Sequence, residues 1–200
     1  MNGSFETLST ECFRKLMRPH AIEIYQRALG ATDVMDLRED GVKVHVLDKE
    51  FGIDSLIEFE SGQWISVQEK YRANDYPVKP WLRLIAECPD FTQEYLNAAG
   101  TQYEAPGEWF KLGAQLYFYG WANSDNTGFA AWLILNIPRY KLLVETNGGL
   151  AALGDLYRNK QHGAATFYCI PVVRLKPAVL VSHGLPCLEK RPLQERLALT

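Results

Sequence analysis

Residues 52–72 read GIDSLIEFESGQWISVQEKYR, and this stretch decides the fold that we expect for the whole chain. Two runs, at 53–59 and 64–71, are rich in the branched and aromatic residues that favour β-strands. The residues ESGQ lie between them, and Gly62 can adopt the positive φ that a tight turn requires. The stretch therefore predicts a β-hairpin with a loop of about four residues.

The second predicted strand places Gln68 and Lys70 on one face, because side chains alternate between the two faces of a strand. Asp54 opens the preceding strand, and the twist of the pair brings its carboxylate toward them. Carboxylate and amide oxygens suit Mg²⁺, and an ammonium group offsets the charge that grows on an attacked phosphate. Asp54, Gln68 and Lys70 together predict a site for metal-dependent hydrolysis of phosphodiester bonds. The alternative is that Asp54 caps a turn, with Gln68 and Lys70 on a solvated face.

An Asp after Gly-Ile, then a hairpin, then Gln-x-Lys resembles the PD-(D/E)XK nuclease superfamily. The resemblance is closest to the Mrr-type restriction endonuclease branch, in which Gln-x-Lys stands in place of Glu-x-Lys. The matching residues are Asp54, Gln68 and Lys70, and the likeness covers residues 20–72 and more loosely the chain to about 175. It implies an α/β fold of the restriction-endonuclease type, with a mixed sheet flanked by helices and a core in the order α-β-β-β-α-β.

The resemblance also implies a Mg²⁺-dependent DNA endonuclease, with Mn²⁺ as a substitute metal. Asp54 would bind the metal, the Gln68 side chain and the backbone carbonyl of Glu69 would complete its shell, and Lys70 would position the attacking water. Glu69 departs from the family pattern, since the middle residue is usually small or apolar. We expect Glu69 to be paired or near a rim; otherwise it takes part itself, in place of Gln68.

An acidic residue on the first core helix often faces the metal site in this superfamily. Glu23 is the best match by position, and Glu11 is the fallback. The alternative for Glu23 is an ordinary solvated position on the helix.

The composition is that of an ordinary globular protein, with 47% hydrophobic and 22% charged residues in 200. This length predicts one domain over 1–200, with a core at about 10–175 and a packed tail at 176–200. A net charge of −3 excludes a protein that coats nucleic acid through bulk positive charge, so a nuclease here needs a local basic groove. The four cysteines form no CxxC pair and are expected to be free thiols.

Periodicity and breakers predict the other elements. Helices are expected before Pro19, from His20 to a stop at Gly30, at 90–99, after a cap at Asn136, and at 193–199. Strands are expected at 34–37, 42–47, 115–121, 129–135 and 165–173.

Two basic clusters predict contacts to nucleic-acid phosphates. Arg72 and Lys79 follow the hairpin among aromatic residues, and Arg158, Lys160 and His162 precede the last predicted strand. The alternative is that both clusters are ordinary surface loops.

The chain begins MNGSFETLST, without a basic n-region or an apolar h-region, and no apolar run is long enough to span a bilayer. We therefore expect a cytoplasmic protein. Its expected substrate is DNA, with RNA less favoured, in restriction, repair, phage or mobile-element defence. A homodimer or a partner protein would supply specificity. The alternative function is a binding or assembly module of nuclease fold with weak or no cleavage.

Overall fold

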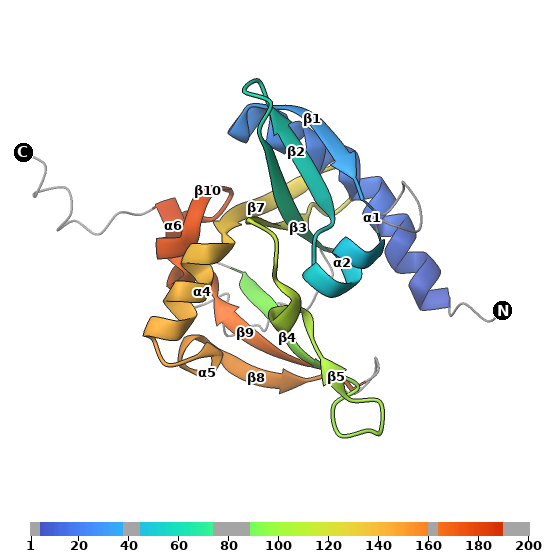
Figure 1. Cartoon of the computed structure of the whole chain (residues 1–200), viewed down its shortest axis with the longest axis vertical. Coiled ribbons are helices and arrows are strands. Elements are labelled where there is room, and N and C mark those ends of the chain that lie inside the picture. The colour runs from blue at the N-terminus through green and yellow to red at the C-terminus, as the bar shows by residue number, and fades with distance from the viewer. Residues whose placement is uncertain (1–4, 38–44, 74–88, 160–163, 190–200) are drawn as a thin grey trace, which may run out of the picture. The chain divides into compact units, whose positions relative to one another are not determined.

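The computed structural model describes residues 5–37, 45–73, 89–159 and 164–189 (Figure 1). The chain divides into two compact units. The first comprises residues 1–76 and 112–134, and the second comprises residues 77–111 and 135–200.

The first unit begins with helix α1 (Phe5–Ile24), which continues through the π-helical turn η1 (Tyr25–Leu29). The predicted break at Pro19 is wrong, because α1 passes through it. Proline removes one helical hydrogen bond, but Met17, Ala21 and Tyr25 are fully buried, and tertiary packing holds the helix. The predicted stop at Gly30 is confirmed, with φ of 76°.

The predicted hairpin is confirmed. Strands β2 (Ser55–Phe59) and β3 (Trp64–Arg72) pair antiparallel, and Gly62 has φ of 74° in the loop between them. Strand β1 (Ala31–Asp36) pairs antiparallel with β2 on the other side. The strand predicted at 42–47 is wrong at its end, because helix α2 (His45–Phe51) starts there; residues 42–44 lie outside the described residues.

The sheet continues beyond β3 with β6 (Leu116–Ala122), which runs parallel to β3, and with β7 (Phe129–Asn136). Its order is β1-β2-β3-β6-β7, followed by β10 (Val179–His183). The aromatic strands predicted at 115–121 and 129–135 are confirmed. A mixed sheet with helices confirms the α/β class in this general form.

The second unit contains another sheet, in the order β5-β4-β9-β8. The helix predicted at 90–99 is wrong, because Asp90–Asn97 forms strand β4, which pairs antiparallel with β9 (Thr166–Pro171). The strand predicted at 165–173 is thereby confirmed in most of its length. The two outer strands are β5 (Ala105–Pro106) and β8 (Asp155–Arg158).

Helix α4 (Ile137–Thr146) belongs to the same unit, and its predicted cap is confirmed, since the Asn136 side chain accepts a 2.9 Å hydrogen bond from the Arg139 N–H. Short elements complete the unit: η2 (Glu108–Lys111), α5 (Leu150–Leu153), η3 (Val172–Ala178) and α6 (Pro186–Glu189). The helix predicted at 193–199 lies outside the described residues. Cys12 and Cys169 are in no disulfide bond, but Cys187 is disulfide-bonded, so the expectation of four free thiols is wrong for Cys187.

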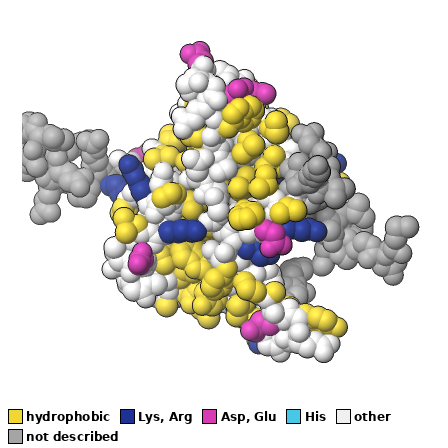
Figure 2. All heavy atoms as spheres, in the orientation of Figure 1, with side chains coloured by type: hydrophobic (Ala, Val, Ile, Leu, Met, Phe, Trp, Pro, Cys, Tyr) yellow, Lys and Arg dark blue, Asp and Glu magenta, His cyan; other side chains and the backbone are white. Residues whose placement is uncertain are grey.

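Hydrophobic side chains gather over β4 and β9 on the face shown in Figure 2. The rings of Tyr95 and Phe110 lie 5.1 Å apart, those of Tyr95 and Tyr168 lie 5.4 Å apart, and Phe110 is 54% exposed. Part of the aromatic content of the chain is therefore at the surface. Within the described part of the chain, no helix combines the length and the apolar character of a membrane span.

Candidate functional site

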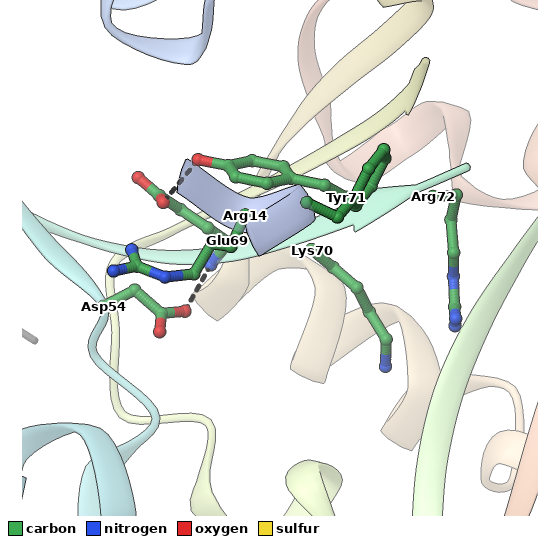
Figure 3. Close-up of a pocket in the computed structure, with 7 residues that line it drawn as sticks. Arg14, Asp54, Glu69, Lys70, Tyr71 and Arg72 are labelled. Carbon is green, nitrogen blue, oxygen red and sulfur yellow. Dashed lines mark hydrogen bonds between the residues drawn. The ribbon is translucent and has the colours of Figure 1, made fainter. Parts of the chain in front are cut away.

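A pocket of about 210 Å³ lies in the first unit, beside the second half of β3. Helix α1 and strand β3 provide most of its wall, and Asp54 comes from the turn that leads into β2. The lining residues are Phe13, Arg14, Asp54, Glu69, Lys70, Tyr71 and Arg72 (Figure 3).

Strand β3 sends its side chains to two sides in alternation. Lys70 and Arg72 point to one side, and Glu69 and Tyr71 point to the other (Figure 3). The same alternation places Gln68 on the side of Lys70. The sheet thus gives Gln68, Lys70 and Arg72 a common face, which we call the Lys70 face.

The Asp54 carboxylate is fixed at the edge of β3. The backbone N–H of Asp54 donates to the Val67 carbonyl at 2.9 Å, and the side-chain Oδ2 of Asp54 accepts a 2.7 Å hydrogen bond from the backbone N–H of Glu69. Asp54 is only 1% exposed. Because the N–H and C=O of one strand residue face the same neighbour, the Glu69 carbonyl also faces the side on which Asp54 lies. The structure therefore brings Asp54 together with the Gln-x-Lys segment.

The Glu69 side chain lies on the opposite side of the sheet, in a buried cluster. Arg18 Nη1 lies 2.5 Å from both carboxylate oxygens of Glu69, and the Glu69 side chain is only 2% exposed. The hydroxyl groups that donate to the same carboxylate are those of Tyr25 at 2.9 Å, Ser55 at 2.8 Å and Tyr71 at 2.5 Å. Glu69 is therefore paired, and only its backbone faces the candidate site. We call this set the Glu69 cluster.

The cluster changes the titration of its phenols. Burial, followed by the negative charge of Glu69, holds the pKa of both Tyr25 and Tyr71 well above 10.0. Both hydroxyls therefore stay protonated donors at neutral pH. The cluster joins α1 to β3 through one carboxylate.

Arg14 lines the pocket and was missed from the sequence. Its Nη1 lies 2.9 Å from Asp36 Oδ2, and its Nε lies 3.4 Å from Glu11 Oε2. Burial works against the charged form, but the hydrogen bonds and negative charges of Asp36 and Glu11 together outweigh it and raise the pKa of Arg14. Arg14 and Arg18 are four residues apart, which places both on one helix face. That spacing was the signal in the sequence that points to this pair.

Other predicted site residues lie elsewhere. Glu23 is on the exposed side of α1, where it forms a 2.6 Å ion pair with Arg27, and it does not line the pocket. The fallback Glu11 contacts the pocket residue Arg14. Arg158 is in the second unit, at the end of β8, and donates to the Ala99 carbonyl. Lys79, Lys160 and His162 lie outside the described residues.

Oxygen donors suited to Mg²⁺ are present next to Lys70, although no group of three or more His, Cys, Asp and Glu side chains forms a metal site in the described residues. Gln68 is 7% exposed, and its Oε1 is buried without a hydrogen-bond partner. Mg²⁺ keeps several waters and needs only one or two carboxylates, so Asp54, the Gln68 amide oxygen and the Glu69 carbonyl fit it by donor chemistry. Searches against family models, curated proteins and solved structures find no match to the chain.

Proposed function

We propose that the protein is a Mg²⁺-dependent nuclease that hydrolyses phosphodiester bonds in DNA, with Asp54, Gln68 and Lys70 at its active site. The observation that carries this proposal is the hydrogen bond from the Glu69 N–H to the Asp54 carboxylate. It holds the carboxylate next to the residue that precedes Lys70, and both side chains line one pocket.

The order of elements supports the proposal further. Helix α1 is followed by β1, β2 and β3 as an antiparallel meander, and β6 then lies parallel beside β3. This agrees with the core that the resemblance to the PD-(D/E)XK superfamily implies. There are two departures in the described residues: helix α2 lies between β1 and β2, and β4, β5 and η2 lie between β3 and β6, where a helix is expected.

The side chains of the pocket have distinct roles in this proposal. Bound Mg²⁺ would supply Lewis-acid activation of water and charge neutralisation at the phosphate. The Asp54 carboxylate is held in place to bind it, and the Gln68 oxygen supplies a neutral donor. Lys70 hydrogen-bonds the attacking water and offsets the charge that develops on the phosphate.

The pocket is locally basic, as a nuclease with an acidic chain requires. Arg14, Lys70 and Arg72 line it, whereas the chain carries a net charge of −3. The Glu69 carboxylate is paired with Arg18 on the other side of the sheet, and Arg14 is in turn paired with Asp36 and Glu11. Lys70 and Arg72 are the basic lining residues that would attract a phosphate to this pocket.

Cleavage assays with purified protein test the proposal. Plasmid and single-stranded DNA are incubated with Mg²⁺, Mn²⁺ or chelator, using the wild type beside Asp54→Asn and Lys70→Met. Lys15→Met is the matched control, because it removes one lysine charge from an exposed position of α1 that does not line the pocket. We expect metal-dependent cutting that is lost in both site variants and kept in the control. Cutting that survives in both site variants would remove the assignment.

A binding or assembly module is the second candidate, favoured by the shortage of acidic groups. The described residues hold no cluster of three metal-binding side chains, and the pocket is mainly cationic. Retained DNA binding with no cutting in either metal, by folded wild-type protein, would support this function over the first. A role in restriction, repair or defence, with a second copy or a partner protein supplying specificity, stays a prediction.

A further inference from the structure

We infer that the Lys70 face binds an unpaired nucleotide next to the scissile phosphate, with its base stacked on Trp121, so that the substrate is single-stranded DNA. This inference rests on the proposed function, and it names the substrate class of that same site.

Strand β6 places a row of aromatic residues beside the cations of β3. In the parallel ladder Lys70 is in register with Tyr119, and Arg72 is in register with Trp121. Residues in register point to the same side of a sheet, so both rings lie on the Lys70 face. The ring centres of Tyr119 and Trp121 are 4.7 Å apart and the rings are inclined by 50°, so the two rings pack against each other.

Arg72 is held against the Tyr119 ring. Its Nε donates a 2.7 Å hydrogen bond to the Tyr119 hydroxyl, and its guanidinium carbon lies 5.6 Å from the centre of the same ring. Both contacts restrict the side chain before any ligand arrives, and an arginine that is ordered in advance loses less entropy on binding. Arg72 is thus positioned for a phosphate next to Trp121.

Trp121 is the member of this row that offers a surface for stacking. Tyr117 and Tyr119 are fully buried, whereas Trp121 is half-buried. Indole gives a large surface to a base, and stacking on aromatic side chains tolerates any base sequence.

The geometry selects one strand. Lys70 and Arg72 are two residues apart on β3, which is about 6.6 Å along the strand, so they follow one backbone. A ring can stack only on a base whose face is open, and in a duplex both faces are covered by neighbouring bases.

The test is equilibrium binding without cleavage. Fluorescence anisotropy in chelator measures Kd for a labelled single-stranded DNA, the same sequence as a duplex, and the same sequence as RNA. The variants are Trp121→Leu, which keeps an apolar side chain, Trp121→Phe, which keeps an aromatic ring, and Arg72→Met. Circular dichroism shows whether each variant is folded.

We expect wild type to bind single-stranded DNA more tightly than duplex. Trp121→Leu should weaken the single-stranded complex roughly 5- to 150-fold, with Trp121→Phe in between and the duplex changed less than about twofold. Arg72→Met should weaken binding and lower the salt slope by about one. If Trp121→Leu does not fold, tryptophan fluorescence provides the test. We expect single-stranded DNA to quench the fluorescence of the wild type more than that of Trp121→Phe.

Equal affinity of wild type for both DNA forms, or an equal loss in both forms for Trp121→Leu, would overturn the inference. Tighter binding of RNA than of DNA would also overturn it. These failures are separate from failure of the proposed function: a metal-dependent duplex nuclease indifferent to Trp121 keeps the function and loses the inference. Stacking-dependent binding with no cutting in either metal keeps the inference and removes the catalytic role.

Discussion

The carboxylate of Asp54 and the backbone N–H of Glu69 form a 2.7 Å hydrogen bond across the point where β2 and β3 separate. Here β2 has not yet begun, so the carboxylate takes the place of a strand neighbour for β3. Asp54 therefore has a structural task as well as its proposed task in metal binding. The two tasks are separable by experiment.

Asp54→Ala is expected to lower the free energy of unfolding by about 1–3 kcal/mol, because a buried backbone N–H loses its acceptor. Asp54→Asn keeps an acceptor oxygen, and its free energy of unfolding is expected to fall by less than half as much as that of Asp54→Ala. Urea unfolding at pH 7 measures both. Cleavage should be lost in both variants alike, and equal stability of the two would show that the hydrogen bond contributes nothing.

Arg18→Met is expected to lower the free energy of unfolding by about 3–5 kcal/mol, since it leaves the buried Glu69 carboxylate without its cation. Burial opposes the charge of Arg18, but its partners, led by Glu69, raise its pKa, so Arg18 is charged in the folded protein. Chemical denaturation measures the loss. Lys15→Met serves as the exposed control on the same helix, and a loss in Arg18→Met no larger than in that control would contradict the role of the cluster.

Tyr71→Phe is expected to lower stability at pH 7 by about 1.5–3 kcal/mol, because it removes a hydrogen bond to a charged group. It keeps the ring that contacts Phe118 and Phe129. The loss of stability caused by Tyr71→Phe should become smaller at alkaline pH. The pKa of Tyr71 is raised in the folded state, so its contribution is complete below 10.0, the ordinary tyrosine value, and is lost as the pH rises through the folded pKa.

Urea titrations from pH 7 to pH 11 measure this pH dependence. Wild type should lose stability above pH 10 more steeply than Tyr71→Phe, because only the wild type has this phenol to ionise on unfolding. Parallel curves for the two proteins would show that Tyr71 does not contribute.

Gly120→Ala is expected to lower the free energy of unfolding by about 1–3 kcal/mol, because the added methyl group overpacks the core. A Cβ at Gly120 would meet the Phe129 ring at 2.4 Å and the Phe118 ring at 3.0 Å. Gly128→Ala is the matched control, because its Cβ would approach Asn123 only to 3.9 Å. Thermal unfolding compares the two, and equal midpoints would contradict the close packing of β6 against these rings.

Local pattern was enough for the hairpin and for the Lys70 face. Both depend on period-two alternation and on one turn glycine, Gly62, and these act within a few residues. Asn136 was likewise readable as a cap, because its hydrogen bond is to Arg139, three residues ahead.

The predictions from sequence failed where contacts with residues far away in the sequence determine the structure. Residues 90–97 carry spacing compatible with a helix, but pairing with β9 makes them a strand with Phe91 and Gln93 fully buried. Arg14 joins the pocket through the packing of α1, and the Glu69 cluster assembles from four elements. The spacing of Arg14 and Arg18 places both on one helix face, but no local pattern shows what that face contacts.

The pleat of β3 also has a consequence for protein engineering. Codon 69 specifies an anchor for the scaffold, while codons 68, 70 and 72 specify the face offered to a ligand. A combinatorial library at those three even positions would sample new ligand-binding preferences on an intact scaffold, and would lose the catalytic groups that we propose at 68 and 70. The same library shifted by one residue would mostly yield proteins that fail to accumulate.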